Sequence, residues 1–514
     1  MLFLKFALAI IPIVWLIVSL SRLKMPSHKA CGIALIITFI LAISYWKLSV
    51  VNTSTAAAEG VLTALWPICL VIIAALFTYN LTVHTNAMDT IKKMLAGISD
   101  DKRILMLMIG WGFGNFMEGM AGFGTAMAIP ASMLAGIGVD PIQAVTACLV
   151  ANTMPTAFGS VGVPTATLAQ VSGLELAPLA ANVALIEGLI TFISPFLMII
   201  ICGGGIKALK GVMGITLTAS LSFVVPWFIT AQFLGAELPD IIGSTCSILC
   251  MIAAIKLFKN KPSPEYSIGL VNEDMKFKIS SKDGLRAWMP FILILVFLIV
   301  TSTLFPVINK PLSSIKSSFK IYSGEGGKAL SFIWINTPGI LIFAAAIIGG
   351  LIQKASIAEI FKVFLSTLKK YWKTVFTICA VIAIAKIMTY SGMISDIANM
   401  LVVTTGSFYP FVSPFIGVLG AFITGSGTSS CVLFGKLQQE TAVSLSLNPY
   451  WITAANVMGA GIGKMVCPQG IAIGTSAINA VGSESKILSA VFKYFIFYTL
   501  LACIICFAGA WINI

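Results

Sequence analysis

The stretch from Gly110 to Gln170 constrains the fold most, because it is apolar enough for a lipid bilayer yet is repeatedly interrupted by glycine and proline. A carboxylate residue, Glu118, lies in its glycine-rich first half. In hydrocarbon every backbone amide needs a hydrogen-bond partner, so a broken segment is tolerated only where protein covers it or where it lines a cavity. The stretch therefore predicts one half of a solute-binding site inside a membrane protein.

The composition indicates the same class. Of the 514 residues, 58% are apolar and 10% are charged, and the mean hydropathy is +1.00, whereas soluble domains contain about 25% charged residues. We expect an all-α polytopic membrane protein in which Phe3–Leu20 is retained as a spanning helix rather than removed as a signal peptide. The net charge of +13 is a topology signal, since Lys and Arg gather in cytoplasmic loops. Lipid is thus an expected partner and nucleic acid is not.

Little in the chain suits catalysis or metal binding. The eleven cysteines lie almost entirely in apolar runs, and the C-x-x-C pair Cys503 and Cys506 sits in mid-span. The two histidines, His28 and His84, fall in loops or at span ends. We therefore expect no cofactor, no metal and no catalytic residue. A membrane enzyme that uses Ser426 with Lys464 as its base is the enzymatic alternative.

Apolar runs and basic loops predict the topology. Runs near the ~20 residues that a span needs are Phe3–Leu20, Cys31–Trp46, Val61–Tyr79, Ala180–Cys202, Val212–Leu234, Ile241–Phe258, Met289–Phe305, Trp334–Ile352, Thr374–Tyr390 and Ile487–Ile512. Loops rich in Lys and Arg are assigned to the cytoplasm. Loops poor in them are assigned to the outside, namely those with Lys47/Glu59, Glu175 and Glu237/Asp240. The glycines at 119–124 then predict a re-entrant hairpin, followed by one broken span from Ile142 to Gln170.

The C-terminal third, from Phe422 to Ala477, repeats this pattern. Gly122-Phe-Gly-Thr125 matches Gly425-Ser-Gly-Thr428 at an offset of 303, and Asn152 and Pro164 match Asn456 and Pro468 at an offset of 304. The first copy begins inside and ends outside, and the second does the reverse. Paired interrupted segments of opposite orientation are typical of secondary transporters, whose site lies near the midplane where the repeats meet.

This count gives 12 spanning helices and two re-entrant hairpins with both termini outside. Fourteen spans without hairpins would keep the same parity. The predicted divisions are N-terminal spans in 1–60, the first repeat in 61–258, a cytoplasmic loop in 259–288, spans and a connecting loop in 289–352, and the second, inverted repeat in 353–514.

The broken segments carry groups that suit an organic anion. A half-helix that begins inside the membrane points unpaired N–H groups and the positive end of its dipole into the cavity, and glycine lets a ligand approach the backbone. The candidate residues of this kind are Gly122, Gly124, Thr125, Ser426, Thr428 and Ser429. Close helix packing through small residues is the alternative, but the duplication of the pattern favours binding.

Three amides, one hydroxyl and one cation complete the candidate substrate site: Asn152, Asn456, Gln469, Thr153 and Lys464. Both asparagines are expected where a span unwinds, with helix capping as the alternative role. A lysine at mid-bilayer costs about 2.5–3.5 kcal/mol and usually faces a partner or substrate, so Lys464 is the candidate substrate counter-ion unless it snorkels to the interface. Glu118 is the candidate proton-coupling residue, and a fixed ion pair with Lys464 is its alternative.

At these residues the chain resembles the bacterial L-lactate permease family over most of its length. The strings that carry the resemblance include EGMAGFGTAMAI (Glu118–Ile129), CLVANTMPTAFGSVGVP (Cys148–Pro164), SPFIGVLGAFITGSGTSS (Ser413–Ser430) and AANVMGAGIGKMVCPQGIAI (Ala454–Ile473). The resemblance implies uptake of L-lactate, and also of D-lactate or glycolate, by proton symport across the bacterial inner membrane. A more distant resemblance to the ion-transporter superfamily implies a transport domain that moves against a scaffold, often in a homodimer.

Two positions depart from the pattern of the family that the chain resembles. Family members often have Asp where this chain has Gly427, and Asn where it has Cys431. A carboxylate of the second repeat is therefore missing, which leaves Glu118 to serve coupling. We expect a proton-coupled importer of a small 2-hydroxymonocarboxylate. A sodium-coupled carrier of another small organic acid is the alternative, whereas a channel is disfavoured because no selectivity ring is visible.

Overall fold

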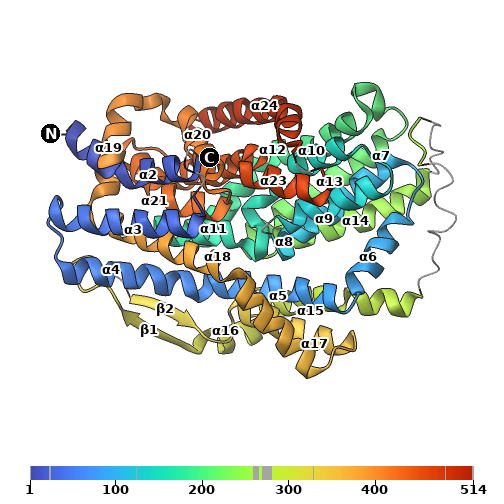
Figure 1. Cartoon of the computed structure of the whole chain (residues 1–514), viewed down its shortest axis with the longest axis horizontal. Helices are drawn as coiled ribbons and strands as arrows, with labels where there is room; N and C mark the ends of the chain where they lie inside the picture. The colour runs from blue at the N-terminus through green and yellow to red at the C-terminus, as the bar shows by residue number, and fades with distance from the viewer. Residues whose placement is uncertain are drawn as a thin grey trace.

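The computed structural model describes the whole chain except residues 1, 22, 24, 123, 259–264, 269–279, 328, 481 and 512–514. Among the described residues, ten helical stretches are long and apolar enough to cross a membrane, and the bent pair Pro141–Ala151 and Pro155–Ser172 makes an eleventh if it is one span. The prediction of an all-α polytopic membrane protein is confirmed. Figure 1 shows helices throughout, with one small pair of strands at the edge of the molecule.

One set of helices consists of long runs, and we call it the long-helix group. Its members are α3 (Ser27–Ser44), α4 (Val50–Thr63) continued through η1 (Ala64–Cys69) into α5 (Leu70–His84), α15 (Ser281–Val300), α17 (Pro338–Ile352) and α18 (Ile357–Ser391). These helices pack against one another in the lower half of Figure 1. Gly60 permits the close approach of α4 and α18, because a Cβ atom there would lie 2.5 Å from the Cα atom of Ala383.

The second set, the hairpin group, contains two helical hairpins and the helices around them. The first hairpin runs through α7 (Lys102–Leu105), η2 (Met106–Phe113) and α8 (Gly114–Met120), then returns along α9 (Thr125–Gly136). The second consists of α20 (Tyr409–Thr424) and α21 (Gly427–Ser444). Packed on them are α12 (Leu176–Gly203), α13 (Met213–Leu234), α14 (Pro239–Phe258) and α24 (Glu484–Trp511). This group fills most of the upper half of Figure 1.

Glycine makes both hairpin turns possible. Gly122 and Gly124 have φ angles of +57° and +83°, and Gly425 has +70°. These values lie in the left-handed region, which glycine adopts without the steric cost of a Cβ atom. Both turns therefore occur where the duplicated Gly-x-Gly-Thr pattern predicts them.

Each hairpin is followed by a broken helix. In the first, α10 (Pro141–Ala151) gives way to η3 (Pro155–Phe158) and α11 (Gly159–Ser172) with a bend of 61°. In the second, α22 (Pro449–Val466) stops at Cys467, which is extended, and α23 (Pro468–Ala477) begins at the following proline. Proline lacks an N–H donor and pushes the preceding residue toward extended geometry, so it ends a helix.

Four expectations need correction. Asn456 does not lie where a span unwinds, because α22 is continuous through it and breaks only at Cys467. Glu59 and Asp240 are not loop residues, since they lie buried in α4 and α14. The connecting loop after α15 contains α16 (Pro306–Ser314) and an antiparallel pair, β1 (Lys316–Lys320) and β2 (Ala329–Ile333), that the sequence did not predict.

The predicted divisions stay predictions, and the helix bounds show only where each of them falls in the chain. Those after residues 258 and 352 coincide with the ends of α14 and α17, whereas those after 60 and 288 fall inside α4 and α15. The remaining described helices are α1 (Leu2–Ala9), α2 (Ile11–Ser21), α6 (Ala87–Ala96), η4 (Ile206–Leu209), α19 (Met393–Thr405) and η6 (Gly406–Phe408).

Candidate functional site

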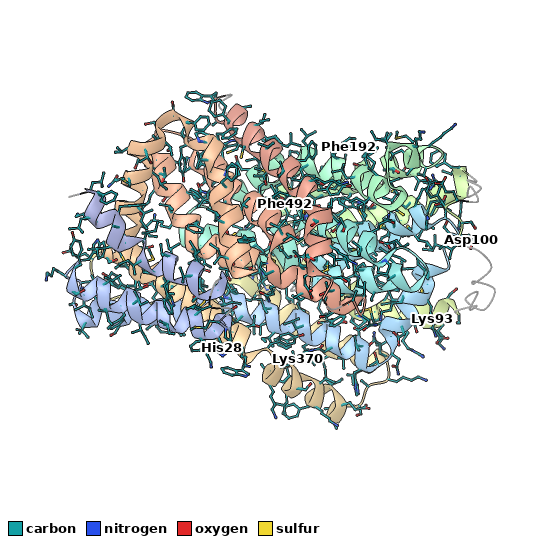
Figure 2. All side chains as sticks on the ribbon, turned by 45° about the horizontal axis from the view of Figure 1, so that its top comes forward. His28, Lys93, Asp100, Phe192, Lys370 and Phe492 are labelled. Carbon is teal, nitrogen blue, oxygen red and sulfur yellow. The ribbon has the colours of Figure 1, made fainter. Side chains whose placement is uncertain are left out.

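The hairpin turns and the helix breaks meet at a cavity of about 260 Å³. Pockets for drug-sized ligands measure about 300–1,000 Å³, so this one suits a small solute. The long-helix group supplies one wall with Ser27 of α3 and with Tyr371, Thr374, Thr377 and Ile378 of α18. Figure 2 labels His28 and Lys370, the neighbours of Ser27 and Tyr371, close to each other at the edge of this group. The cavity therefore lies where the two groups meet.

An ion pair stands in the wall of the cavity. Lys464 Nζ lies 2.8 Å from Glu118 Oε1 and also donates a hydrogen bond to Thr156 Oγ1 at 3.1 Å. The Glu118 side chain is 3% exposed and that of Lys464 is 18% exposed. Glu118 Oε2 has no hydrogen-bond partner in the described part of the chain. The structure thus forms the ion pair that the sequence offered as an alternative role for Glu118.

Local sequence explains how this pair is accommodated. Lys464 lies in the last turn of α22, where the helix dipole favours a cation. Glu118 lies in α8 against Gly159, where a Cβ atom would come within 2.7 Å of Glu118 Oε1. Gly159 is therefore required for the carboxylate to reach the lysine.

Among the described helices that begin at the cavity wall are α9, α21 and α23. Gly124 is the N-cap of α9, Ser426 caps α21 by accepting a hydrogen bond from Ser429 N at 3.2 Å, and Cys467 caps α23 by accepting one from Gly470 N at 3.2 Å. The first N–H groups of a helix lack intrahelical partners, and the dipole is positive at this end, so such termini attract anions. Together with Lys464 they make the cavity electrostatically suited to a small anion.

Hydroxyl and amide groups complete the lining. Thr153 and Thr156 donate to the carbonyls of Leu149 and Asn152 at 3.0 and 2.7 Å, which leaves their hydroxyl oxygens able to accept. Asn152 caps α10, and its Nδ2 has no hydrogen-bond partner in the described part of the chain. A buried donor without a partner costs about 1–3 kcal/mol, so this amide is available to a polar ligand.

The structure brings most of the predicted site residues together. Those that line the cavity are Glu118, Gly124, Asn152, Thr153, Ser426, Thr428, Ser429, Lys464 and Gln469. Thr125 begins α9 directly after Gly124. Gly122 lies in the turn but packs against Ser160. Asn456 lies outside the cavity, because its side chain contacts Gln438 and the carbonyl of Ser430 and so holds α21 on α22.

Sequence reasoning missed several lining residues: Ser27, Thr156, Ser160, Tyr371, Thr374, Thr377 and Thr424 among them. Tyr371, Thr374 and Thr377 come from α18, outside the repeated segments. They follow one another at intervals of three residues, which places them on one helix face. That spacing was the available signal.

Comparisons with known proteins add the following. A family model described as L-lactate permease matches residues 5–513. An L-lactate permease of Streptococcus iniae is 46% identical over 447 residues, which cover 87% of this chain and 93% of that protein. The glycolate permease GlcA of Escherichia coli is 34% identical over 537 residues, covering 96% and 92%. Among solved structures, MtrF of Neisseria gonorrhoeae has a similar fold, with a TM-score of 0.53 at 11% identity, covering 96% of this chain and 97% of MtrF.

Proposed function

This chain belongs to the L-lactate permease family, whose members are transporters rather than enzymes, and from this premise we propose that it imports L-lactate by proton symport. The proposal extends to D-lactate and glycolate, and the similarity to a glycolate permease supports this extension. The chain is a multi-pass membrane protein. We assign it to the bacterial plasma membrane, with both termini outside as the distribution of basic loops favours.

The proposal rests mainly on Lys464, because its ammonium group is already bound by residues of the protein and would also bind the substrate. Lys464 is bonded to Glu118 and Thr156, and all three residues line the cavity. A substrate carboxylate that enters must compete with Glu118 for the same ammonium group. The helix N-termini at Gly124, Ser426 and Cys467 favour the substrate anion, and we propose that Asn152 and Thr153, which also line the cavity, bond its hydroxyl group.

Competition for Lys464 supplies a reason for coupling. Without substrate, the lysine and Glu118 carry no net charge as a pair. Bound lactate adds one negative charge, and an uncompensated buried charge is costly. A proton on Glu118 restores neutrality. The binding site can therefore change its access from one side of the membrane to the other either when it is empty or when it holds both lactate and a proton. Among the described lining residues Glu118 is the only carboxylate.

Gly427 also concerns the number of carboxylates available for proton coupling. It lines the cavity, and a Cβ atom there would lie 2.8 Å from Thr156 Cγ2. The Cβ atom of an acidic side chain at this position would therefore lie next to Thr156, which is hydrogen-bonded to Lys464. Its absence leaves the second repeat without a coupling carboxylate, in keeping with one proton per substrate.

Purified protein in liposomes tests the proposal. Lactate uptake should follow an inward proton gradient and persist when choline replaces sodium at fixed pH. In Glu118→Gln the stimulation by the gradient should fall about tenfold or more. Glu59→Gln is the matched control, since Glu59 also pairs with a lysine but lies outside the cavity. Wild-type stimulation in Glu118→Gln would contradict the proton role, and loss of uptake in choline would favour the sodium-coupled alternative.

The homodimer implied by the distant resemblance is part of the proposal. Multi-angle light scattering of the detergent-solubilised protein should give twice the mass of the 54.6 kDa chain. A monomer mass in detergent and in nanodiscs would contradict it.

A further inference from the structure

Two buried carboxylates in the hairpin group lack a cation. In the described part of the chain six charged residues are buried: Glu59, Asp101, Arg103, Glu118, Glu187 and Asp240. The first four belong to ion pairs, Glu59 with Lys386, Asp101 with Arg103, and Glu118 with Lys464. Glu187 and Asp240 form no ion pair with any described residue, although each is 1% exposed.

Asp240 packs against the first hairpin, in contact with Gly119 of α8. It occupies the first turn of α14, and its Oδ1 accepts a hydrogen bond from Trp227 Nε1 at 2.9 Å, while Oδ2 has no partner among the described residues. Its Cβ atom packs against Gly119, where an added Cβ would lie only 2.8 Å away. Gly119 follows Glu118 in the chain, so Asp240 packs against the residue next to the glutamate of the ion pair.

Glu187 lies near the middle of α12, and neither of its carboxyl oxygens has a hydrogen-bond partner in the described part of the chain. Electrostatic interactions join Glu187 to Asp240 and Cys431, and Asp240 to Glu118 and Lys464. The helix of Asp240, α14, also packs directly on α8, which carries Glu118. The three carboxyl groups thus form a series from Glu118 through Asp240 to Glu187, on α8, α14 and α12.

This series cannot be fully ionised. With Lys464 as its cation, three carboxylates would leave two uncompensated negative charges away from water. Isolated buried carboxylates bind a proton rather than bear that cost, and neighbouring carboxylates share protons as a unit. Acidic residues inside membrane segments commonly form proton relays. A purely structural neutral acid is the competing explanation.

We propose that Asp240 and Glu187 form a second proton-binding pair that supplies the proton to Glu118 during transport, an inference that rests on the proposed function. When lactate takes Lys464, an O–H bond of the pair breaks and one on Glu118 forms. The pair then regains a proton from external water. After lactate leaves toward the cytoplasm, Lys464 bonds Glu118 again and the proton of Glu118 is released on that side. One proton thus enters for each lactate.

Glu187→Gln and Asp240→Asn test this proposal because both keep the shape of the side chain. In liposomes we expect the ratio of gradient-driven uptake to lactate counterflow to fall about tenfold or more. Glu59→Gln, which alters a buried glutamate of the other group, should keep the wild-type ratio. Counterflow verifies that a variant is folded. A wild-type ratio in both variants would show that the pair is structural and would overturn the proposal.

Infrared difference spectra of the wild-type protein keep the test decisive if a variant does not fold. Addition of lactate should create the carbonyl band of one newly protonated carboxylic acid, since the pair regains its own proton from water, and the new band should be absent in Glu118→Gln. No change in any carboxylic acid band would overturn the proposal. Failure of the proposed function is distinct, because the wild-type protein itself would then show no uptake driven by the proton gradient.

Discussion

Among the described residues, each helix group has a buried glutamate–lysine ion pair, and the two pairs are almost identical in distance and exposure. Lys386 Nζ lies 2.7 Å from Glu59 Oε1 and Lys464 Nζ lies 2.8 Å from Glu118 Oε1. The side chains of the glutamates are 4% and 3% exposed, and those of the lysines 21% and 18%. Ion-pair geometry alone therefore does not distinguish a functional pair from a structural one.

The surroundings of the two pairs differ. Glu59 and Lys386 lie within the regular helices α4 and α18, and Glu59 Oε1 accepts a second hydrogen bond from Tyr390 at 2.9 Å. Tyr390 stacks on Tyr322 with ring centroids 3.7 Å apart. Glu118 and Lys464 instead lie beside a hairpin turn and a helix break, and both line the cavity. What separates the pairs is whether a competing anion can reach the lysine.

Removing the cavity lysine should have the largest effect on transport. Lys464→Met keeps the length of the side chain but removes the ammonium group, so lactate uptake should fall by about 100-fold or more, which corresponds to about 2.8 kcal/mol. Lys464→Arg should recover only part of the activity, because a planar guanidinium does not replace a compact ammonium. Uptake and counterflow in liposomes measure both. Near wild-type uptake by Lys464→Met would refute the role of Lys464 as substrate counter-ion.

Displacing Glu118 without changing its charge should have the next largest effect. In Gly159→Ala the new methyl group would lie 2.7 Å from Glu118 Oε1 and must push the carboxylate away from Lys464. We expect uptake to fall about tenfold, as a small misplacement of a functional group commonly costs that much or more. Gly188→Ala, where the added Cβ meets no atom within 4 Å, is the control. Equal uptake by the two variants would argue against precise placement of Glu118.

Loss of the hydroxyl group that holds Lys464 should have a smaller effect. Thr156→Val keeps the shape of the side chain but removes the 3.1 Å hydrogen bond from Lys464 Nζ. A hydrogen bond to a charged group contributes about 1.5–3 kcal/mol, and the exposed part of Lys464 lets water replace much of it. We expect KM for lactate to rise about threefold to tenfold with little change in maximal rate. An unchanged KM would mean that Thr156 does not orient the lysine for substrate.

Breaking the Glu59–Lys386 ion pair of the long-helix group should have the smallest effect on transport and the largest effect on stability. Lys386→Met leaves the Glu59 carboxylate buried with Tyr390 as its donor, which should destabilise the protein by about 3 kcal/mol, at the low end for a broken buried pair. KM should stay at the wild-type value. Adding Glu59→Gln should recover part of the melting temperature, since it removes the unpaired charge. A large change in KM in the double variant would show that the two pairs are coupled.

The comparison also shows what the sequence could predict. Glu118 and Lys464 were identifiable because charges are rare in glycine-rich apolar segments, and the duplicated pattern located both hairpin turns. Glu59 and Asp240 were wrongly assigned to loops, because each lies near one end of an apolar run, where charges usually mark the membrane surface. Their burial depends on tertiary contacts, and the partner of Glu59 is 327 residues away. Such long-range contacts leave no local signal.

The wrong prediction that Asn456 lies at a helix break also has a physical cause. The repeat correctly pairs Asn152 with Asn456 in sequence, but only the first lies at a break. Pro155 follows Asn152 closely, whereas no proline follows Asn456 until Pro468. Pseudo-symmetry therefore predicted the architecture better than it predicted which residues line the cavity.

The single carboxylate of the described cavity wall limits how much work the proposed carrier can do. If one proton accompanies each lactate anion, no net charge crosses the bilayer, and the membrane voltage contributes nothing to accumulation. The pH difference is then the whole driving force, and each pH unit supports at most about a tenfold lactate gradient. Such a carrier runs inward or outward as the two gradients dictate. A cell with little pH difference across its membrane would therefore release lactate through the same protein whenever internal lactate exceeds external lactate.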